Sequence, residues 1–293
     1  MPVTLTIDVF SGRPNPSVVV HGPEEAELLQ RLRPAREAKR RETAPFSESA
    51  LGYRGVIVQV EGRRPRGMQA EFRVVNGIGI AERTSFGVAD EGFEDFVCGS
   101  TGPFRPLFGD EPKLPNFLGR ELRRYRDFWD TWRTPPRIHW PVRPVCPCGP
   151  LYEPAWWNVP SRQPYNNCYN YGTNVRTNTY AQPGRAAGAM YSALTCASVK
   201  PAAVADELID DPGADNKCPK EGHLVALVVA PGWDFHWYRK GRNGRWSHKP
   251  GGTPVTNLDN SSAIITDPRT ADRGPYTDFC TFMVVMHGHV RIT

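Results

Sequence analysis

Cys168 lies in a polar and aromatic stretch, Gln163-Pro-Tyr-Asn-Asn-Cys-Tyr-Asn-Tyr-Gly, that leads into a predicted helix. His236 and His248 follow much later, on segments that have the composition of β-strands. A thiol is a strong nucleophile only as a thiolate, and a helix N-terminus or a nearby imidazole lowers its pKa. The order of these residues therefore predicts thiol chemistry, with Cys168 as the nucleophile and a histidine as its base.

Three histidines, His223, His236 and His248, compete for the role of base. His236, in Asp-Phe-His-Trp-Tyr-Arg, is the first candidate, because its bulky neighbours would hold the ring rigidly. His223, which opens the apolar run Gly-His-Leu-Val-Ala-Leu, is the second. The loop length of a predicted hairpin around Asn243-Gly244 determines whether His236 and His248 lie on the same face of the sheet. A two-residue loop places these two rings on opposite faces, and a three-residue loop with a left-handed Gly244 places them on one face.

The third member of the site depends on that loop. If the two rings share a face, His248 orients His236 and completes a set with Cys168. Otherwise a carboxylate or an amide would fix the tautomer of the base. The candidates for that case are Asp259, Asp267 and, behind them, Asn257.

This order of cysteine, helix and strand histidines resembles the papain-like cysteine hydrolases, which include NlpC/P60-like and bacteriocin-processing peptidases. The resemblance covers about residues 156–270 and rests on order and context, since the Cys-Gly-Ser-Cys-Trp run of the papain branch is absent. It implies a papain-like fold with a thiol nucleophile, an imidazole base and an oxyanion hole. Gln163 and Asn167 are the expected side-chain donors to that hole, with Asn166 as a further option.

The predicted reaction is cleavage of an amide bond, in a peptide or another amide-containing substrate, through a thioester acyl-enzyme. The same groups would serve acyl transfer or transamidation where an amine replaces water. The alternative is a non-enzymatic protein that recognises a glycan, a peptide or nucleic acid through aromatic and basic surfaces. The aromatic candidates for such a surface are Trp156, Trp157, Tyr165, Tyr169, Tyr171, Trp237 and Trp246.

The redox state of the seven cysteines depends on the cellular compartment of the protein. The first residues lack a basic segment followed by an apolar one, so we expect a cytoplasmic protein, or one exported without a cleavable signal peptide. Most cysteines would then be free thiols, and Cys98, Cys196 and Cys280 are predicted core residues. A zinc set is a weaker alternative, because C-x-C departs from the common C-x2-C spacing. We predict no metal and no cofactor; the zinc alternative would use Cys146, Cys148, Cys218 and His223.

The composition of the 293-residue chain limits its partners. The net charge is +5 and the mean hydropathy is −0.49. No apolar run reaches the length of a membrane span, so we predict no membrane insertion. The basic residues between 31 and 41 and between 120 and 143 are typical of solvated faces. Such short basic runs are weak evidence for nucleic-acid binding, so we do not expect nucleic acid as a partner. The oligomeric state is left open by the sequence.

The predicted fold class is α+β. We expect a small N-terminal α+β domain over residues 1–115, a helix and Pro-rich linker over 116–150, and a papain-like catalytic domain over 151–293. In the last, a helix that begins at the nucleophile would pack on an antiparallel sheet. Strands are predicted at 3–10, 17–21, 51–60, 70–81, 223–230, 234–240, 245–249, 263–266 and 279–286, with Asn76-Gly77 as a tight turn. Helices are predicted from Pro23, at 117–132, from Cys168, at 185–199 and at 202–208.

Overall fold

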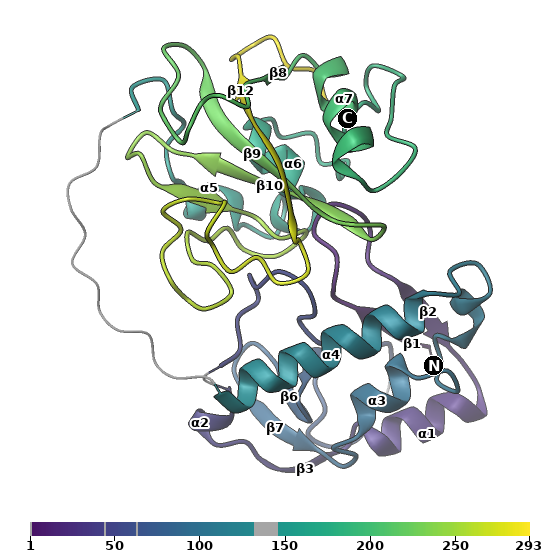
Figure 1. Cartoon of the computed structure of the whole chain (residues 1–293). Helices are drawn as coiled ribbons and strands as arrows, with labels where there is room; N and C mark the ends of the chain where they lie inside the picture. Colours follow the sequence, from purple (N-terminus) through teal and green to yellow (C-terminus); the bar gives the residue numbers. More distant parts are fainter. Residues whose placement is uncertain (1, 44, 63, 132–145) are drawn as a thin grey trace. The chain divides into compact units, whose positions relative to one another are not determined.

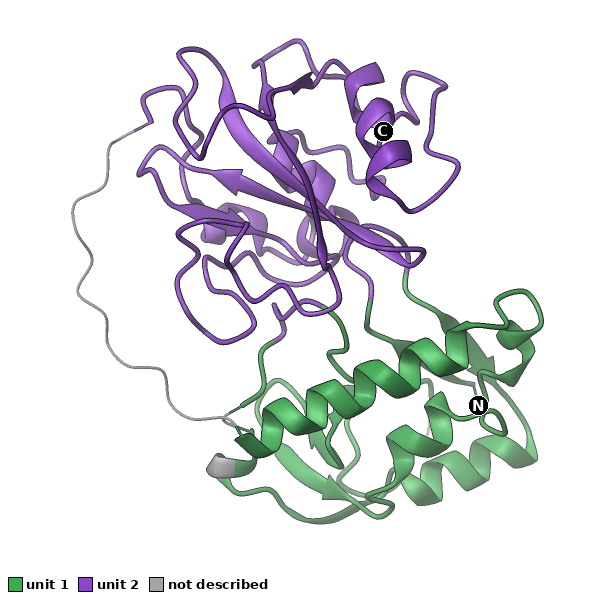
Figure 2. Ribbon diagram, viewed as in Figure 1, with its two compact units in different colours: residues 1–9, 15–47, 52–134 green, residues 10–14, 48–51, 135–293 purple. Residues whose placement is uncertain are grey.

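The computed structural model describes residues 2–43, 45–62, 64–131 and 146–293, and it divides the chain into two compact units (Figures 1 and 2). Unit 1 comprises residues 1–9, 15–47 and 52–134, and unit 2 comprises residues 10–14, 48–51 and 135–293. This division differs from the predicted one. The helix placed in the linker belongs to unit 1, and two short N-terminal segments belong to unit 2. The proline-rich part of the predicted linker, 132–145, lies outside the described residues.

Unit 1 contains a seven-stranded antiparallel sheet in the order β2-β1-β4-β5-β6-β7-β3. Val3, Leu5 and Ile7 of β1 are fully buried and the residues between them are not, as the period-two pattern predicts. Asn76 and Gly77 both have positive φ in the turn between β5 and β6, which confirms the predicted turn. The strands are β1 Val3–Ile7, β2 Ser17–Val20, β3 Pro34–Glu37, β4 Val56–Val60, β5 Glu71–Val75, β6 Ile78–Ile80 and β7 Ser85–Val88.

The helices of unit 1 follow an amphipathic pattern where they are long. In the longest, α4, Leu118, Leu122 and Tyr125 are buried at steps of four and three, as expected for one helix face. None of the helices in the described ranges is long and apolar enough to cross a membrane. The helical segments of this unit are α1 Pro23–Arg31, α2 Arg40–Thr43, α3 Phe93–Cys98, the 3-10 turn η1 Arg105–Phe108 and α4 Leu114–Thr131.

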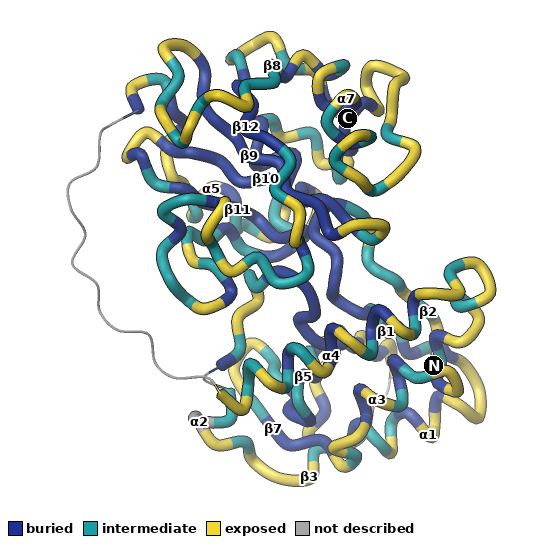
Figure 3. Tube along the Cα trace, viewed as in Figure 1, coloured by how far each residue is buried: buried dark blue, intermediate teal, exposed yellow. Residues whose placement is uncertain are grey.

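Unit 2 contains a five-stranded antiparallel sheet in the order β11-β10-β9-β12-β8, with helices that precede it in the chain. The α+β class is therefore confirmed. Helix α6 packs on β10, and α7 packs on β9 and β12. Strands β9 and β10 are buried along their whole length (Figure 3). The elements are α5 Pro154–Trp157, η2 Gln163–Tyr165, α6 Cys168–Thr173, α7 Cys196–Ala205, β8 Ile209–Asp210, β9 His223–Ala230, β10 Asp234–Lys240, β11 Trp246–His248 and β12 Asp278–Val285.

Two predicted elements of unit 2 are wrong. The predicted helix 185–199 is a series of turns, and α7 begins only at Cys196. Gly184 and Gly188 both have positive φ, a conformation that ends a right-handed helix despite the many alanines nearby. The predicted strand 263–266 forms only an isolated bridge.

Candidate functional site

The hairpin between β10 and β11 places two histidines side by side. Tyr238 pairs with His248 across the hairpin, and the loop 242–244 ends in Gly244 with φ of 72°. This is the three-residue loop that the sequence left as one of two options. His236 and His248 consequently share a face, and their facing ring nitrogens, Nε2 and Nδ1, lie 2.9 Å apart.

A chain of hydrogen bonds determines the tautomers of both rings. His248 Nε2 lies 2.9 Å from the carbonyl oxygen of Leu258, and a carbonyl only accepts, so this nitrogen carries a proton. In a neutral His248 the other nitrogen then accepts from His236 Nε2. The remaining nitrogen of His236, Nδ1, in turn accepts from the hydroxyl of Ser11 at 3.0 Å. In the neutral pair the donors are thus assigned from His236 to Leu258, and the hydroxyl of Ser11 has a second contact, with the hydroxyl of Tyr276 at 2.7 Å.

The Ser11 segment is fixed on β10 by a buried carboxylate. Asp234 accepts the backbone N–H groups of Ser11, Gly12 and Arg13, at 2.5, 3.1 and 3.1 Å, and the hydroxyl of Tyr276 donates to it at 2.5 Å. Burial raises the pKa of Asp234, while these hydrogen bonds oppose that shift. From the sequence, Ser11 falls only in the connection between the predicted strands 3–10 and 17–21. No local signal connects it with a strand more than two hundred residues away.

Cys168 is the first residue of α6, as predicted. The side chain of Asn167 caps the helix and accepts the N–H groups of Tyr169 and Asn170 at 3.1 and 3.2 Å. The thiol itself is fully buried and lies 3.9 Å from the carbonyl oxygen of Phe235. Burial raises the pKa of Cys168 well above that of an ordinary thiol, which favours the neutral thiol over the nucleophilic thiolate.

The expected pairing of Cys168 with His236 is not formed. Side chains alternate along a strand, and Phe235 and Trp237 of β10 pack in the core that contains Cys168. His236, between them, points to the opposite face of the sheet. The second candidate, His223, places Nε2 2.8 Å from the carbonyl oxygen of Gly172 instead. In the described part of the chain, the hydrogen bond of the thiol therefore goes to a backbone oxygen rather than to an imidazole.

The predicted oxyanion donors have other positions. Asn167 donates its amide to the carbonyl oxygens of Gly12 and Ala181, at 2.9 and 2.8 Å, while its oxygen caps α6. Gln163 lies in η2, and its carbonyl oxygen accepts from the buried ammonium of Lys249 at 2.6 Å. The amide of Asn167 is thus occupied by bonds that hold the fold together.

Asp259 orients a loop rather than an imidazole. Its carboxylate accepts the backbone N–H groups of Ser261 and Ala263, at 3.0 and 2.9 Å, and that of Asp272 at 3.0 Å. His248 instead takes the neighbouring carbonyl of Leu258 as its partner. The role proposed for Asp259 as an orienting group is not supported by this geometry, because all of these bonds go to backbone.

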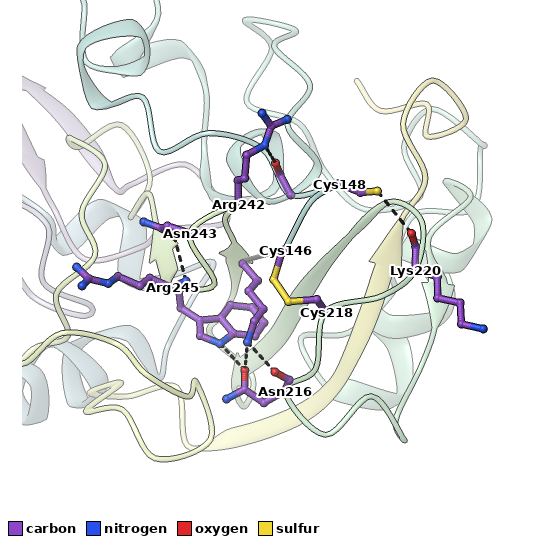
Figure 4. The surroundings of a disulfide bond; sticks show 11 residues. Cys146, Cys148, Asn216, Cys218, Lys220, Arg242, Asn243 and Arg245 are labelled. Atoms are coloured by element: carbon purple, nitrogen blue, oxygen red, sulfur yellow. Dashed lines mark hydrogen bonds between the residues drawn. A yellow bond between two sulfur atoms is a disulfide. The ribbon is translucent and has the colours of Figure 1, made fainter. Parts of the chain in front are cut away.

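Four of the seven cysteines form disulfides, which corrects the expectation of mostly free thiols. Cys146 bonds to Cys218 (Figure 4), and Cys196 bonds to Cys280. The alternative zinc set loses two thiols to the first disulfide, and the predicted core role of Cys196 and Cys280 is replaced by the second. Disulfides persist in oxidising compartments, so of the two predicted locations, the cytoplasm or export without a cleavable signal peptide, these pairs favour the second.

Most of the aromatic candidates belong to the core. Trp156 and Tyr165 are exposed, at 39% and 53%. The indole of Trp156 also stacks under the guanidinium of Arg162, 4.1 Å from the ring centre. The predicted aromatic surface is therefore much smaller than the sequence indicated, since the buried members are Trp157, Tyr169, Tyr171, Trp237 and Trp246.

Fold and site together define an α+β protein with two disulfides and a buried hydrogen-bonded network of one serine and two histidines. The chain is 48% identical over 140 residues to insoluble matrix shell protein 1 of Ruditapes philippinarum. The match spans 47% of this chain and 91% of that relative, so the chain belongs to the family of this shell protein. No family model matches the chain, and no solved structure matches it.

Proposed function

We propose that the protein is a non-catalytic component of an extracellular matrix, in which unit 2 is a disulfide-stabilised structural module. The relationship to an insoluble shell matrix protein carries this proposal, because it extends over nearly the whole of that relative. The two disulfides agree with a location outside the reducing cytoplasm. Export of the chain is part of the same proposal.

The burial of the reactive side chains favours a structural role over catalysis. Ser11, Cys168, His236 and His248 are all fully buried. A nucleophile has to reach its substrate, and these groups are instead bonded to one another or to backbone. Satisfied polar networks of this kind make a core rigid and specify one arrangement of it.

The exposed aromatic side chains of the 151–165 segment contact the matrix. Trp156 and Tyr165 present large amphipathic rings of the kind that is enriched at binding surfaces. Arg162 adds a cationic donor beside the indole. This combination of a ring face with hydrogen-bonding groups suits a neutral polysaccharide, which offers both C–H faces and hydroxyl groups.

Co-sedimentation tests this function. The full chain with its disulfides intact is mixed with insoluble chitin or cellulose particles, and the bound fraction is measured after centrifugation. We expect wild-type protein in the pellet and a large loss of binding in the double variant Trp156→Ala, Tyr165→Ala. Met190→Ala, which removes an exposed apolar side chain elsewhere, is the control. Absence of the native protein from the insoluble extracellular fraction of its producing cells would contradict the matrix role itself.

A thiol hydrolase acting on an amide bond is the second candidate. The position of Cys168 at the capped start of α6, ahead of an antiparallel sheet that carries His236 and His248, favours it and the papain-like arrangement. This function requires a rearrangement that exposes the thiol and turns an imidazole toward it. Iodoacetamide labelling at about pH 7 tests it, because a catalytic thiolate reacts faster than ordinary thiols. Labelling of Cys168 that is no faster than that of free cysteine, both without and with an amide substrate, would exclude the hydrolase.

A further inference from the structure

Cys148 is a free thiol that lies next in the chain to the Cys146–Cys218 disulfide. Cys148 follows two residues after Cys146, and its Sγ donates to the carbonyl oxygen of Lys220 at 3.5 Å (Figure 4). Lys220 in turn lies two residues after Cys218. The free thiol therefore contacts the chain on one side of the disulfide and is joined by a short turn to the other side.

A tight turn keeps Cys148 at this place. The N–H of Gly149 donates to the carbonyl oxygen of Cys146 at 2.9 Å and closes the turn. Arg242 holds both ends, since its carbonyl oxygen accepts from Cys146 and its N–H donates to Pro150, each at 2.9 Å. A side chain at Gly149 would meet the backbone of Arg242 at 2.7 Å, so only glycine allows this approach. The turn thus holds the backbone of Cys148 two residues from Cys146, while its Sγ points toward Lys220 and away from the disulfide (Figure 4). Exchange therefore requires the thiol to rotate about its Cα–Cβ bond toward Cys218.

We propose that these three cysteines form a thiol–disulfide exchange site in which Cys148 is the attacking thiol. Cys148, as the thiolate, attacks Sγ of Cys218 and forms a Cys148–Cys218 bond. The Cys146–Cys218 bond breaks, and Cys146 leaves as a thiolate that takes up a proton. The step is redox-neutral, because one S–S bond replaces another and no oxidant or reductant is consumed.

The two disulfide isomers have nearly equal chain entropy. The existing bond closes a loop with a sequence separation of 72, and the exchanged bond would close a loop only two residues shorter. The equilibrium between the two disulfide isomers is then determined by the turn, whose hydrogen bonds favour Cys146 as the partner of Cys218. Cys148 and Cys218 are only half-buried, so a small thiol or disulfide from solution can also enter the exchange. Its substrates are accordingly low-molecular-weight thiols and the disulfides they form.

In the other disulfide, Cys196–Cys280, the third thiol nearby cannot exchange in the same way. Cys168 packs in the same core cluster, but it is fully buried, and burial raises its pKa. A protonated thiol does not attack a disulfide. This second disulfide is therefore an internal control within the same chain.

Differential alkylation tests the exchange. The full chain is incubated with a trace of reduced glutathione at about pH 8, near the pKa of an ordinary thiol. It is quenched in acid, and free thiols are labelled with light N-ethylmaleimide in denaturant. After reduction, the remaining cysteines receive heavy label, and mass spectrometry gives the ratio at each one. We expect light label on both Cys146 and Cys148, with Cys196 and Cys280 labelled heavy.

The variant Cys148→Ser separates exchange within the site from attack by glutathione. We expect the light label on Cys146 to fall by about tenfold or more in this variant, since the internal thiol is gone. Light label confined to Cys148 in the wild type would overturn the proposal, and so would equal labelling of Cys146 in both proteins. If the variant does not fold, the wild-type protein incubated without glutathione decides the matter, because only internal exchange can then place light label on Cys146. None of these readouts depends on binding to a matrix.

Discussion

His236 illustrates how the tertiary surroundings assign the role of a single residue. Its neighbours in the chain suggested a general base, held in place by aromatic rings. In the fold, both of its ring nitrogens are bonded, one to Ser11 and one to His248, at 3.0 and 2.9 Å. Both nitrogens are thus bonded to side chains within the core, so the contribution of the ring here is to stability.

Replacing Ser11 with alanine tests this contribution. The change leaves Nδ1 of His236 without its buried hydroxyl partner, and such a loss costs about 1–3 kcal/mol of folding free energy. Urea unfolding of the variant measures it. Ser161→Ala, at an exposed serine, is the matched control and should change the free energy of unfolding by less than about 0.5 kcal/mol. Equal effects of the two changes would refute the role given to the hydroxyl.

His223 predicts a dependence of stability on pH. Burial lowers its pKa to about 3, whereas an unfolded histidine titrates near 6.5. The unfolded chain binds the proton first as the pH falls, so the stabilisation is complete above about pH 6.5 and declines toward pH 3. Denaturant unfolding at a series of pH values should give a slope of at most about 1.4 kcal/mol per pH unit from this group.

The variant His223→Gln is the comparison for that slope. Glutamine can still donate to the carbonyl oxygen of Gly172, which His223 Nε2 contacts at 2.8 Å, but it does not titrate. The part of the acid destabilisation that belongs to His223 should therefore disappear. An unchanged slope between pH 6.5 and pH 4 would assign the acid sensitivity to other groups.

Among the elements, α6 depends most clearly on its surroundings. It has only six residues, all of them buried, and isolated helices of this length do not form in water. The reciprocal capping box of Asn167 and Asn170 fixes its first turn. Packing on β10 supplies the rest. The order of cap, cysteine and helix was therefore readable in the sequence, although the helix is stable only in the fold.

Asn167→Ala should be among the most destabilising changes in unit 2. It removes the cap, worth about 1 kcal/mol, and two further hydrogen bonds from its amide to the carbonyl oxygens of Gly12 and Ala181. We expect a total loss of about 2–4 kcal/mol by chemical denaturation. The control is Thr195→Ala at the start of α7, where the side chain makes no capping bond. Similar losses from both variants would show that the cap is not what α6 requires.

At the scale of the whole molecule, the two disulfides lie in unit 2, and each closes a long loop. The sequence separations are 72 and 84 residues, so both bonds restrict the unfolded chain strongly. Both units have their own sheet. Loss of a disulfide should therefore destabilise one unit selectively.

Removal of the Cys196–Cys280 bond, in the double variant Cys196→Ala, Cys280→Ala, checks this selectivity. A loss of about 2–5 kcal/mol is expected in unit 2. Hydrogen exchange resolves the two units, and protection should fall in β9, β10 and β12 while β1 and β4 keep theirs. Equal losses in both sheets would mean that the units unfold together.

The sequence by itself determined those features that depend on a few neighbouring residues. The alternation in β1 and the stepped apolar face of α4 are periodic, and period follows from backbone geometry alone. The apolar run of β9 has no period, but its eight consecutive positions are those of a strand that is buried on both faces. The cap before Cys168 is local in the same sense, since Asn167 bonds to the N–H groups of Tyr169 and Asn170, two and three residues away. Local chemistry misled only where composition competed with backbone conformation, as at Gly184 and Gly188.

Only the tertiary structure decided which chemical groups meet. Cys168 and His236 were predicted to form a pair, yet α6 packs on the face of β10 opposite to that histidine. Ser11, 225 positions away in the chain, took the place of the thiol as the partner of His236. The pairing of the cysteines was decided in the same way. Such contacts depend on which sheet face a segment covers and on the loop between strands, and a shift of one residue in register exchanges the two faces.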